Sequence, residues 1–508
     1  ALDTIGGGPT NVEHLTTNPF VLNSMGAFDL SISWNSPARD GGDPLTNTQG
    51  YPINVGNTDL DNNKRINGAR VDIGAFELDG SVYPFISNFS NFSKTYGDAS
   101  FDLTATSESP APITYSGGNN SVATILGSTV TILKAGTITI TASQEAVAGY
   151  PATSKTITMT VAKATLDIVG LGSSKIVGQS DPVLYFKIGT NGLKYNDAAT
   201  IITGSLTRTA GETVGTYAIN SGTLTTSSNY NINYTAANFY IGVAKYVKPV
   251  ASGLGNATSW ADASGDLQAT IALANAGDQV WVAAGTYTSS ATNNSFALKE
   301  KVAVYGGFAG NETTLEQRNW NENTTTLTSN QAVTGNALID NGTVPIGYIT
   351  RLDGFTITNN YGGVMAGAMF NNRASPTISN CIFINNTAGT GASTTRVAAL
   401  YNYNGSSPSI VNTKFINNNS GLVVGAVYDT LNAAPKFTNV TFSNNSAALA
   451  SGVYNTNNST ATITNSILWG DTQTQIVNSI TTGTSTTTVT YSDVQLSSGT
   501  YTGTGNLN

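Results

Sequence analysis

Cysteine, histidine and charge are scarce in this chain of 508 residues, which has one Cys, one His and only 10% charged residues. A single cysteine cannot form an internal disulfide, so the stability of an exported chain must come from extended packing. Because charged residues normally supply about a quarter of a soluble domain, Asn, Thr, Ser and Gly must cover most of this surface. This profile is typical of secreted, repetitive β-proteins.

Clustered positive charge and long apolar runs are also missing. The 22 basic and 30 acidic residues give a net charge of -8 and a pI of about 4.7, with no long run of one sign. Nucleic-acid binding is disfavoured, because phosphate-tracking grooves need clustered Lys and Arg. No apolar stretch approaches the roughly 18 residues that cross a bilayer, so we expect no membrane span in this segment.

A repeated motif runs from residue 353 to residue 470. The strings ISNCIFINN, IVNTKFINN, FTNVTFSNN and ITNSILWGD recur at steps of 32, 27 and 26 residues, as in solenoid proteins. They align a first set of asparagines, Asn380, Asn412, Asn439 and Asn465, each followed three residues later by Phe383, Phe415, Phe442 and Leu468. A second register with steps of 31, 27 and 26 aligns Phe370, Tyr401, Tyr428 and Tyr454.

These strings alternate apolar and polar residues and are separated by Asn-Asn, Asn-Gly or Ser-Pro turn signals. Each coil supplies short strands without a complete core, so apolar faces are buried only when coils stack. We therefore predict a right-handed parallel β-helix with both aromatic sets stacked inside it. The aligned asparagines either pass amide hydrogen bonds from coil to coil or merely tolerate left-handed turns.

A short helix is expected before the coils. Asp266 can cap it, and Leu267, Ile271 and Ala274 fall on one side. The strand VWVAAG follows. We interpret the helix as a lid over the first coil, since an open solenoid end exposes unpaired backbone.

Two segments resemble parts of β-helix proteins common among Bacteroidota surface proteins. Residues 245–330, with SWADA, GDQVWVAAGTY and YGGFAGNET, resemble their start, and residues 28–78, with SPARDGGD, TDLDNNKRI and VDIGAFE, resemble their closing segment. The closing segment thus precedes the start, and the last residues, YSDVQLSSGTYTGTGNLN, look like a coil broken midway. We infer one period of a tandem array, cut within its β-helix.

Two smaller β-modules lie between these segments. Residues 83–162 show alternating strands and turn signals every 8 to 12 residues and resemble bacterial Ig-like modules. Residues 163–243 resemble MBG-type modules, although IVGQSDP stands where that family usually shows VYGDxxP. The chain is therefore predicted to be all-β, with β-helix coils in 1–80, a sandwich in 81–162, an MBG-type module in 163–244, and a cap with coils in 245–508.

The resemblance implies a repetitive extracellular adhesin or filament unit at the cell surface, exported by type IX secretion and serving attachment, motility or capture. Expected partners are neighbouring copies in the array, homo-oligomeric bundles, and glycans or proteins of other cells. The alternative is a polysaccharide lyase or hydrolase with a substrate cleft along the parallel sheet. An inert stalk is a third hypothesis.

Carbohydrate cleavage requires paired carboxylates, or a base with a cation. The charged residues of the coils from 351 to 471 show no adjacent Asp pair and no recurring acid: Arg351, Asp353, Arg373, Arg396, Lys414, Asp429, Lys436 and Asp471. Asp429 replaces an Asn beside the Tyr register, and we interpret it as a substitution at a surface bend. We therefore expect no enzyme and no catalytic, cofactor or metal site.

Other candidate residues favour structural roles. Cys381 is predicted to be a small buried residue and His14 to lie in a loop. Asp59, Asp61 and Asn63 offer alternate oxygen ligands for Ca²⁺, but Arg70 holds the twelfth position, where an EF-hand has an acid, so a structural turn is favoured.

Aromatic and threonine-rich segments offer two further surfaces. The tryptophans are scattered, which favours packing over sugar binding: Trp34, Trp260, Trp281, Trp320 and Trp469. A binding loop would be sought at 387–396. TITITAS and TSTTTVTYS raise an ice-binding alternative, which needs Thr pairs in a flat repeated register that the four aligned coils do not show.

Overall fold

The structure, a computed structural model, describes ten segments and the backbone of two further strands. The segments are residues 84–117, 121–289, 295–329, 337–342, 345–359, 365–388, 397–421, 423–480, 483–496 and 501–507. The two strands, β1 (Phe20–Leu22) and β2 (Phe28–Ile32), pair antiparallel. Most of the predicted closing segment, 1–80, lies outside the described residues, and the four predicted domain boundaries stay predictions.

The chain divides into two compact units. One comprises Ala1–Asp167, Ile188–Thr203 and Thr225–Asn233, and the other comprises Ile168–Lys187, Gly204–Leu224 and Tyr234–Asn508. Nearly all their regular structure is β. Within the described residues, no helix is long and apolar enough to cross a membrane.

The first unit contains a small β-sandwich. Its sheets run in the orders β3-β9-β8-β5 and β4-β7-β6. The strands are β3 (Phe92–Thr95), β4 (Phe101–Asp102), β5 (Thr114–Gly117), β6 (Ala123–Leu126), β7 (Thr129–Ile132), β8 (Gly136–Gln144) and β9 (Thr153–Ala162). Alternate residues of a strand point to opposite faces, so β8 buries Ile138 and Ile140 between its threonines.

Seven short strands follow between residues 164 and 242. They are β10 (Ala164–Gly170), β11 (Ser173–Ile176), β12 (Phe186–Ile188), β13 (Thr207–Arg208), β14 (Gly215–Asn220), β15 (Tyr230–Thr235) and β16 (Ala237–Gly242), with a 3-10 turn η1 (Ala199–Ile201). Their sheets run β11-β16-β14-β13 and β12-β10-β15. In the second unit, Leu206, Ile219, Phe239 and Ile241 form the small core of the first of these sheets.

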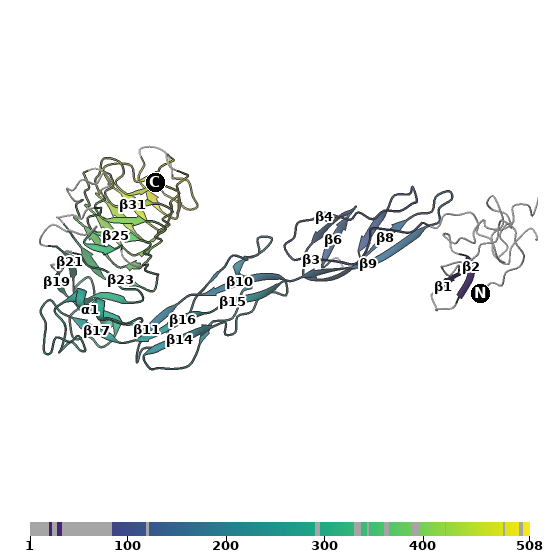
Figure 1. The fold of residues 1–508 in the computed structure, drawn as a ribbon. Helices are drawn as coiled ribbons and strands as arrows, with labels where there is room; N and C mark the ends of the chain where they lie inside the picture. The colour runs from purple at the N-terminus through teal and green to yellow at the C-terminus, as the bar shows by residue number, and fades with distance from the viewer. Residues whose placement is uncertain are drawn as a thin grey trace, which may run out of the picture. The chain divides into compact units, whose positions relative to one another are not determined.

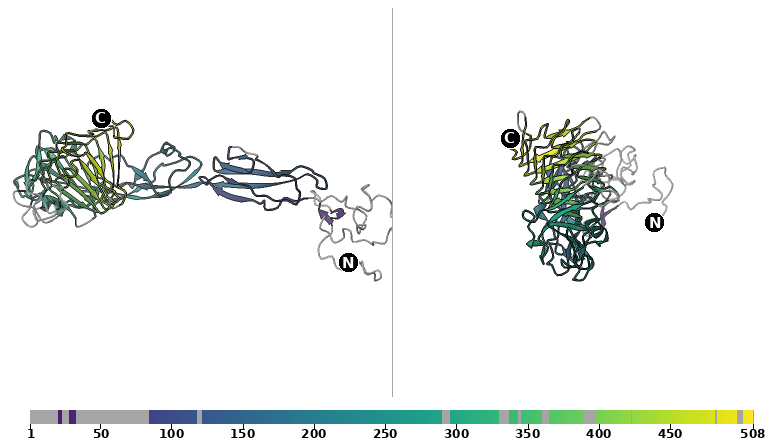
Figure 2. Two further views of the ribbon diagram at one scale, coloured as in Figure 1. Left: turned by 90° about the horizontal axis from the view of Figure 1, so that it is seen from above. Right: turned by 90° about the vertical axis from the view of Figure 1, so that its left-hand side faces the viewer.

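From residue 244 the second unit is a parallel β-helix whose coils stack in Figures 1 and 2. The first sheet has nine strands: β17 (Ala244–Val247), β18 (Gln279–Ala283), β20 (Ala303–Phe308), β23 (Arg351–Asp353), β26 (Thr377–Ser379), β29 (Ser409–Val411), β32 (Lys436–Thr438), β35 (Thr460–Thr464) and β38 (Thr486–Thr490). The prediction of an all-β chain with a parallel β-helix is confirmed.

Two further sheets complete the wall. One has β19 (Gly285–Thr288), β21 (Thr325–Thr328), β24 (Phe355–Ile357), β27 (Ile382–Ile384), β30 (Lys414–Ile416), β33 (Thr441–Ser443), β36 (Ile467–Trp469) and β39 (Asp493–Val494). The other has β22 (Ile339–Asn341), β25 (Met369–Asn372), β28 (Leu400–Tyr403), β31 (Val427–Thr430), β34 (Val453–Asn455) and β37 (Ile476–Asn478). A 3-10 turn, η2 (Leu315–Gln317), interrupts an early coil.

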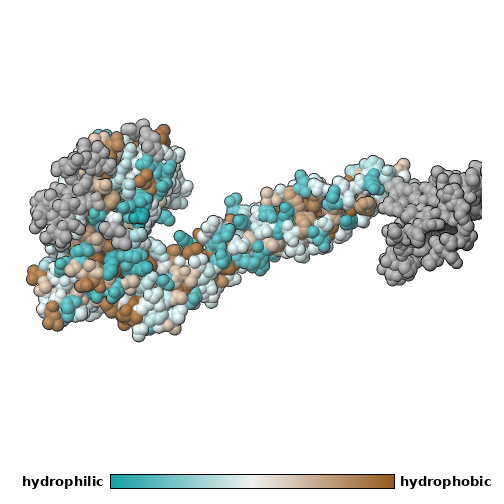
Figure 3. All heavy atoms as spheres, in the orientation of Figure 1, coloured by the Kyte–Doolittle hydropathy of each residue, from teal (hydrophilic) through white to brown (hydrophobic). Residues whose placement is uncertain are grey.

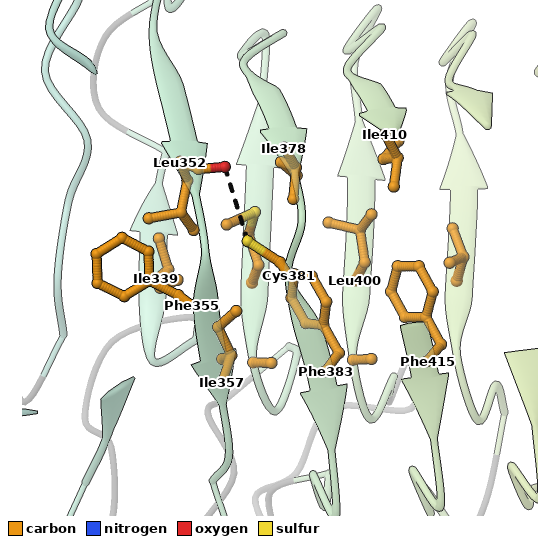
Figure 4. Packing of buried hydrophobic residues seen from close by; sticks show 14 of the residues in the cluster. Ile339, Leu352, Phe355, Ile357, Ile378, Cys381, Phe383, Leu400, Ile410 and Phe415 are labelled. Atoms are coloured by element: carbon orange, nitrogen blue, oxygen red, sulfur yellow. Dashed lines mark hydrogen bonds between the residues drawn. The ribbon is translucent and has the colours of Figure 1, made fainter. Parts of the chain in front are cut away.

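The β-helix core is a set of side-chain columns, one residue per coil. Phe383, Phe415, Phe442 and Leu468 are paired in register, as predicted. The phenyl rings of Phe383 and Phe415 are stacked at 4.9 Å between centroids, as are those of Phe415 and Phe442. Figure 4 shows the first two of these rings beside Cys381 and aliphatic side chains from neighbouring strands.

A short helix, α1 (Leu267–Leu273), covers the first coils, as predicted. The Asp266 carboxylate accepts a hydrogen bond from the Ala269 N–H at 2.9 Å, which caps the helix. Leu267, Ile271 and Ala274 join the same core as the strand residue Val280. The helix thus closes the apolar interior at this end.

Candidate functional site

The Tyr column, which comprises Phe370, Tyr401, Tyr428 and Tyr454, is in register across β25, β28, β31 and β34. The register is confirmed, but the prediction that this column stacks inside the main core is wrong. Met369 and Leu400 take the inward positions, so their neighbours Phe370 and Tyr401 point the other way. The Tyr column packs in a separate cluster with small residues, Ala337, Ala366, Val397 and Val424.

The Tyr column offers little for stacking on a sugar ring. Tyr428 and Tyr454 are half-buried and lie 5.4 Å apart with an interplanar angle of 20°, so each ring covers a face of the other. Burial raises the pKa of Tyr401 and Tyr428, so both phenols are neutral at physiological pH.

All four asparagines of the first predicted set adopt left-handed turns, and three of them also pass amide hydrogen bonds from coil to coil. Asn380, Asn412, Asn439 and Asn465 all have left-handed backbones, with φ between 49° and 56°. Asn412 Nδ2 donates to Asn380 Oδ1 at 3.4 Å, and Asn439 Nδ2 donates to Asn412 Oδ1 at 3.2 Å. The four residues thus shape the turn, and the side chains of Asn380, Asn412 and Asn439 also link neighbouring coils.

Two buried columns of polar residues escaped the sequence analysis. The first Asn column comprises Asn341, Asn371, Asn402, Asp429, Asn455 and Asn478; the second Asn column comprises Asn386, Asn418, Asn445 and Asp471. In the second, each asparagine follows a left-handed residue, Asn385, Asn417 or Asn444. The repeated Asn-Asn pair was therefore the available signal: its first member turns the chain and its second points inward.

Each amide of the second Asn column joins successive coils. Asn418 Nδ2 donates to Phe383 O at 3.0 Å in the preceding coil and to Asn445 Oδ1 at 2.8 Å in the following coil. Asn386 Nδ2 in turn donates to Asn418 Oδ1 at 2.8 Å. Because buried polar groups are costly when unpaired, these columns favour one register of coil on coil.

The interpretation of Asp429 as a surface substitution is wrong. Its side chain continues the inward-facing first Asn column, so the residue is completely buried. Burial raises the pKa of the Asp429 carboxyl to about 7, and that of Asp471, at the end of the second Asn column, to about 6.

Asp353, the other buried acid among the predicted coil charges, forms a hydrogen-bonded ion pair. Arg318 donates to its Oδ1 at 2.6 Å, Ser379 Oγ to its Oδ2 at 2.5 Å, and Asn380 Nδ2 to both oxygens at 3.1 and 3.2 Å. The more exposed Arg351 approaches at 3.4 Å. A carboxylate whose two oxygens accept this many hydrogen bonds holds its neighbours in place, which suits it poorly to act as a base.

The remaining predicted residues divide between packing positions and positions outside the described residues. Cys381 is buried, as predicted; its thiol donates to Ser379 O at 3.2 Å, and burial raises its pKa to about 12. His14, Trp34, the calcium candidates Asp59, Asp61 and Asn63, and most of the loop 387–396 lie outside the described residues. Among those that are described, no group of three or more His, Cys, Asp or Glu is placed to hold a metal ion.

Two of the described tryptophans pack and two reach solvent. Trp281 is fully buried, and Trp260 lies 4.9 Å from the ring of Tyr246. Trp320 is 37% exposed and stacks on Arg318, while Trp469 is 46% exposed. On the face shown in Figure 3, hydrophobic and hydrophilic residues are interspersed over the described surface.

The structure contains paired threonine rows that the sequence analysis did not recognise. The sandwich Thr array pairs Thr137 with Thr160, Thr139 with Thr158 and Thr141 with Thr156 across β8 and β9. The coil Thr array pairs Thr460 with Thr486, Thr462 with Thr488 and Thr464 with Thr490 across β35 and β38. Most of these side chains are exposed. The partner strand β38 lies beyond the four aligned coil motifs, which explains why alignment missed the pairing.

Comparison with known proteins identifies one module. Residues 166–240 match the MBG domain (YGX type). No curated protein matches the chain. A crystal structure of pectate lyase Pel9A is similar at 14% identity and a TM-score of 0.29, covering 49% of this chain and 62% of that chain. The chain thus spans less than two thirds of that protein, and a similarity of this extent carries no argument about activity.

In the MBG segment, the unusual string IVGQSDP has a structural use. Its Asp181 bridges two largely buried cations, Lys175 and Arg208, each at 2.6 Å. The Arg208 hydrogen bond is the main cause that lowers the pKa of Asp181 below its ordinary value. Gln179 thus stands at the position of the acid in the family pattern, and Asp181, two residues later, anchors β11 to β13.

Proposed function

We propose that this chain is a repetitive extracellular unit that extends from a cell surface and attaches, through many weak contacts, to other cells or surfaces. The observation that carries the proposal is that polar side chains along the coils are committed to binding the next coil: Asn418 and its column partners link coil to coil, and Asp353 is held by four neighbouring side chains. Side chains used in this way stabilise a long stack of coils in one register rather than form a reactive cleft.

The matched MBG domain supports an extracellular or surface location, since modules of this type occur in surface proteins. The sequence resemblances at 28–78 and 245–330 support an origin in Bacteroidota with type IX export and a tandem arrangement of copies. In such an array, avidity raises the effective affinity of weak sites by roughly 10²–10⁴-fold without new contacts.

A comparison of valency tests this function. The chain displayed in many copies on beads is expected to bind whole cells or a glycan array, whereas the same chain in solution should bind weakly. The matched control is an equal number of beads carrying only the isolated segment 84–162. No binding at any valency would favour a stalk.

Incubation with acidic and neutral polysaccharides is expected to give no reducing ends and no unsaturated products, and appreciable turnover would instead support a lyase or hydrolase.

The paired threonines favour ice binding as a second candidate function. In-register threonines lie about 4.8 Å apart between strands and about 6.8 Å apart along a strand, so methyl and hydroxyl groups form a regular lattice that can order water. The coil Thr array contains no charged residue, although Lys436 occupies the same column one coil earlier. A lysine in this outward column is therefore compatible with the fold.

The chain is accordingly expected to inhibit recrystallisation of ice, and Thr462→Lys with Thr488→Lys should weaken the inhibition because the ammonium groups break the lattice. Ser409→Lys, in the same outward column but away from the array, is the matched control. Equal inhibition by both variants, or none by the unaltered chain, would remove this second function.

A further inference from the structure

The hydrogen bonds of the first Asn column run in one direction along the β-helix. The Leu298 N–H donates to Asn341 Oδ1 at 3.0 Å. Asn341 Nδ2 then donates to Asn371 Oδ1 at 2.9 Å, Asn371 Nδ2 to Asn402 Oδ1 at 3.0 Å, and Asn402 Nδ2 to Asp429 Oδ1 at 2.8 Å. Each coil thus passes one hydrogen bond to the next.

This chain of bonds is interrupted after Asp429, because a carboxylate has no hydrogen to pass on. Asp429 is in register with Asn455 of the next coil. Asp429 Oδ2 and Asn455 Oδ1 are both buried and have no hydrogen-bond partner within the described residues. Two acceptors therefore stand unpaired at the one place where the column lacks a donor.

Turning over the Asn455 amide alone does not repair the interruption, because the Asn478 amide would have to turn with it. Asn455 Nδ2 already donates to Asn478 Oδ1 at 3.0 Å and to Thr487 Oγ1 at 2.7 Å. After a turn, Asn455 Oδ1 would face Asn478 Oδ1, so the clash of acceptors would move one coil along the column.

We infer that Asp429 is protonated in the folded β-helix and that its carboxyl donates this hydrogen to Asn455 Oδ1. One proton then satisfies both unpaired oxygens and makes the column continuous from Leu298 to Asn478. Among the described residues, an ionised carboxylate at this buried position would have a single side-chain donor, Asn402, and no cation.

The groups around Asp429 agree with a neutral carboxyl. From β28 and β34 it faces the amides of Asn402 and Asn455. The titratable residues on these strands and its own are four phenols that pack in the second cluster: Tyr401, Tyr403, Tyr428 and Tyr454. Tyr501 bonds to Asn478 at the end of the column. Burial, with no opposing charge, raises the pKa of Asp429 to about 7.

This proton links stability to pH in a defined direction. Because the folded pKa of about 7 exceeds the ordinary value of 3.8, the stability linked to the proton is complete below about pH 4. This stability is lost as the pH rises towards 7, and above about pH 7 the free energy of unfolding no longer depends on this group. Asp471, whose Oδ2 is also buried without a partner in the described part of the chain, acts in the same direction up to about pH 6.

Infrared difference spectra between the full chain and its Asp429→Asn variant test the inference. At pH 6, where ordinary carboxyls are ionised, the unaltered chain is expected to show one extra protonated-carboxyl band that disappears at pH 9. Between pH 4 and pH 8, its unfolding equilibrium constant should rise by about 10³-fold more than that of the variant, from the pKa values of 3.8 and about 7.

Asp353→Asn is the matched control, because Asp353 is a buried acid of the same β-helix that is paired with Arg318 at 2.6 Å. It is expected to lose stability at neutral pH, whereas Asp429→Asn gains it by restoring an amide to the column. Absence of the infrared band at pH 6, or an unchanged pH dependence in Asp429→Asn, would overturn the inference. Neither result depends on whether the chain is adhesive.

Discussion

Replacing Phe415 with Ala is expected to lower the free energy of unfolding by about 3–5 kcal/mol, the usual range for a large buried aromatic side chain. The ring is fully buried and stacks on Phe383 and Phe442, at 4.9 Å between centroids on each side. Both neighbours are held by β-strand pairing, so the coils cannot collapse into the space left behind. Urea unfolding followed by circular dichroism measures the loss.

Phe415→Leu is the control for this prediction, since Leu468 already occupies the same column two coils later. A change that keeps most of the volume is expected to cost less than about 1.5 kcal/mol. Equal losses for the Ala and Leu variants would mean that the ring stack itself, rather than filled volume, stabilises the column. A loss below 1 kcal/mol in both would contradict the role of Phe415 in the core.

The sequence predicts the register of the β-helix well, because the repeat period determines which residues of successive coils contact each other. In a parallel coil, residues one repeat apart become neighbours across a strand pair. Aligning Phe383 with Phe415 therefore also predicts their contact, and varying steps of 32 and 27 residues do not disturb it, because extra residues enter loops. The same logic predicts the pairing of Tyr401 with Tyr428.

The side of the sheet on which a column lies could not be predicted in the same way. In β25 both Met369 and Phe370 are buried: Met369 belongs to the main core and Phe370 to the second cluster. An apolar-polar alternation identifies an inner face only when the outer face meets water. Here both faces are covered, so pattern alone leaves the Tyr column unassigned.

The buried Asn columns were missed for a related reason. Asparagine is normally a surface or turn residue, and Asn417 indeed has a left-handed backbone, with φ of 55°. Its neighbour Asn418 is fully buried, because coil stacking gives an inward amide partners on both sides. Only knowledge of the stacked neighbours separates the two asparagines.

Replacing Asn418 with Ala should therefore destabilise the β-helix by about 3 kcal/mol or more, at about 1–3 kcal/mol for each buried group left unpaired. The change removes the partners of Phe383 O and of the Asn386 amide, and it breaks the side-chain bond to Asn445. Hydrogen exchange of β27, β30 and β33 should accelerate most, because these strands flank the lost link. Asn419→Ala is the control: that side chain is exposed and, within the described residues, accepts a local bond from the Gly421 N–H, so its loss should cost less than about 1 kcal/mol. If the two variants were equally stable, coil-to-coil amide bonding would not be what fixes the stack, and hydrophobic columns such as that of Phe415 would have to account for its register alone.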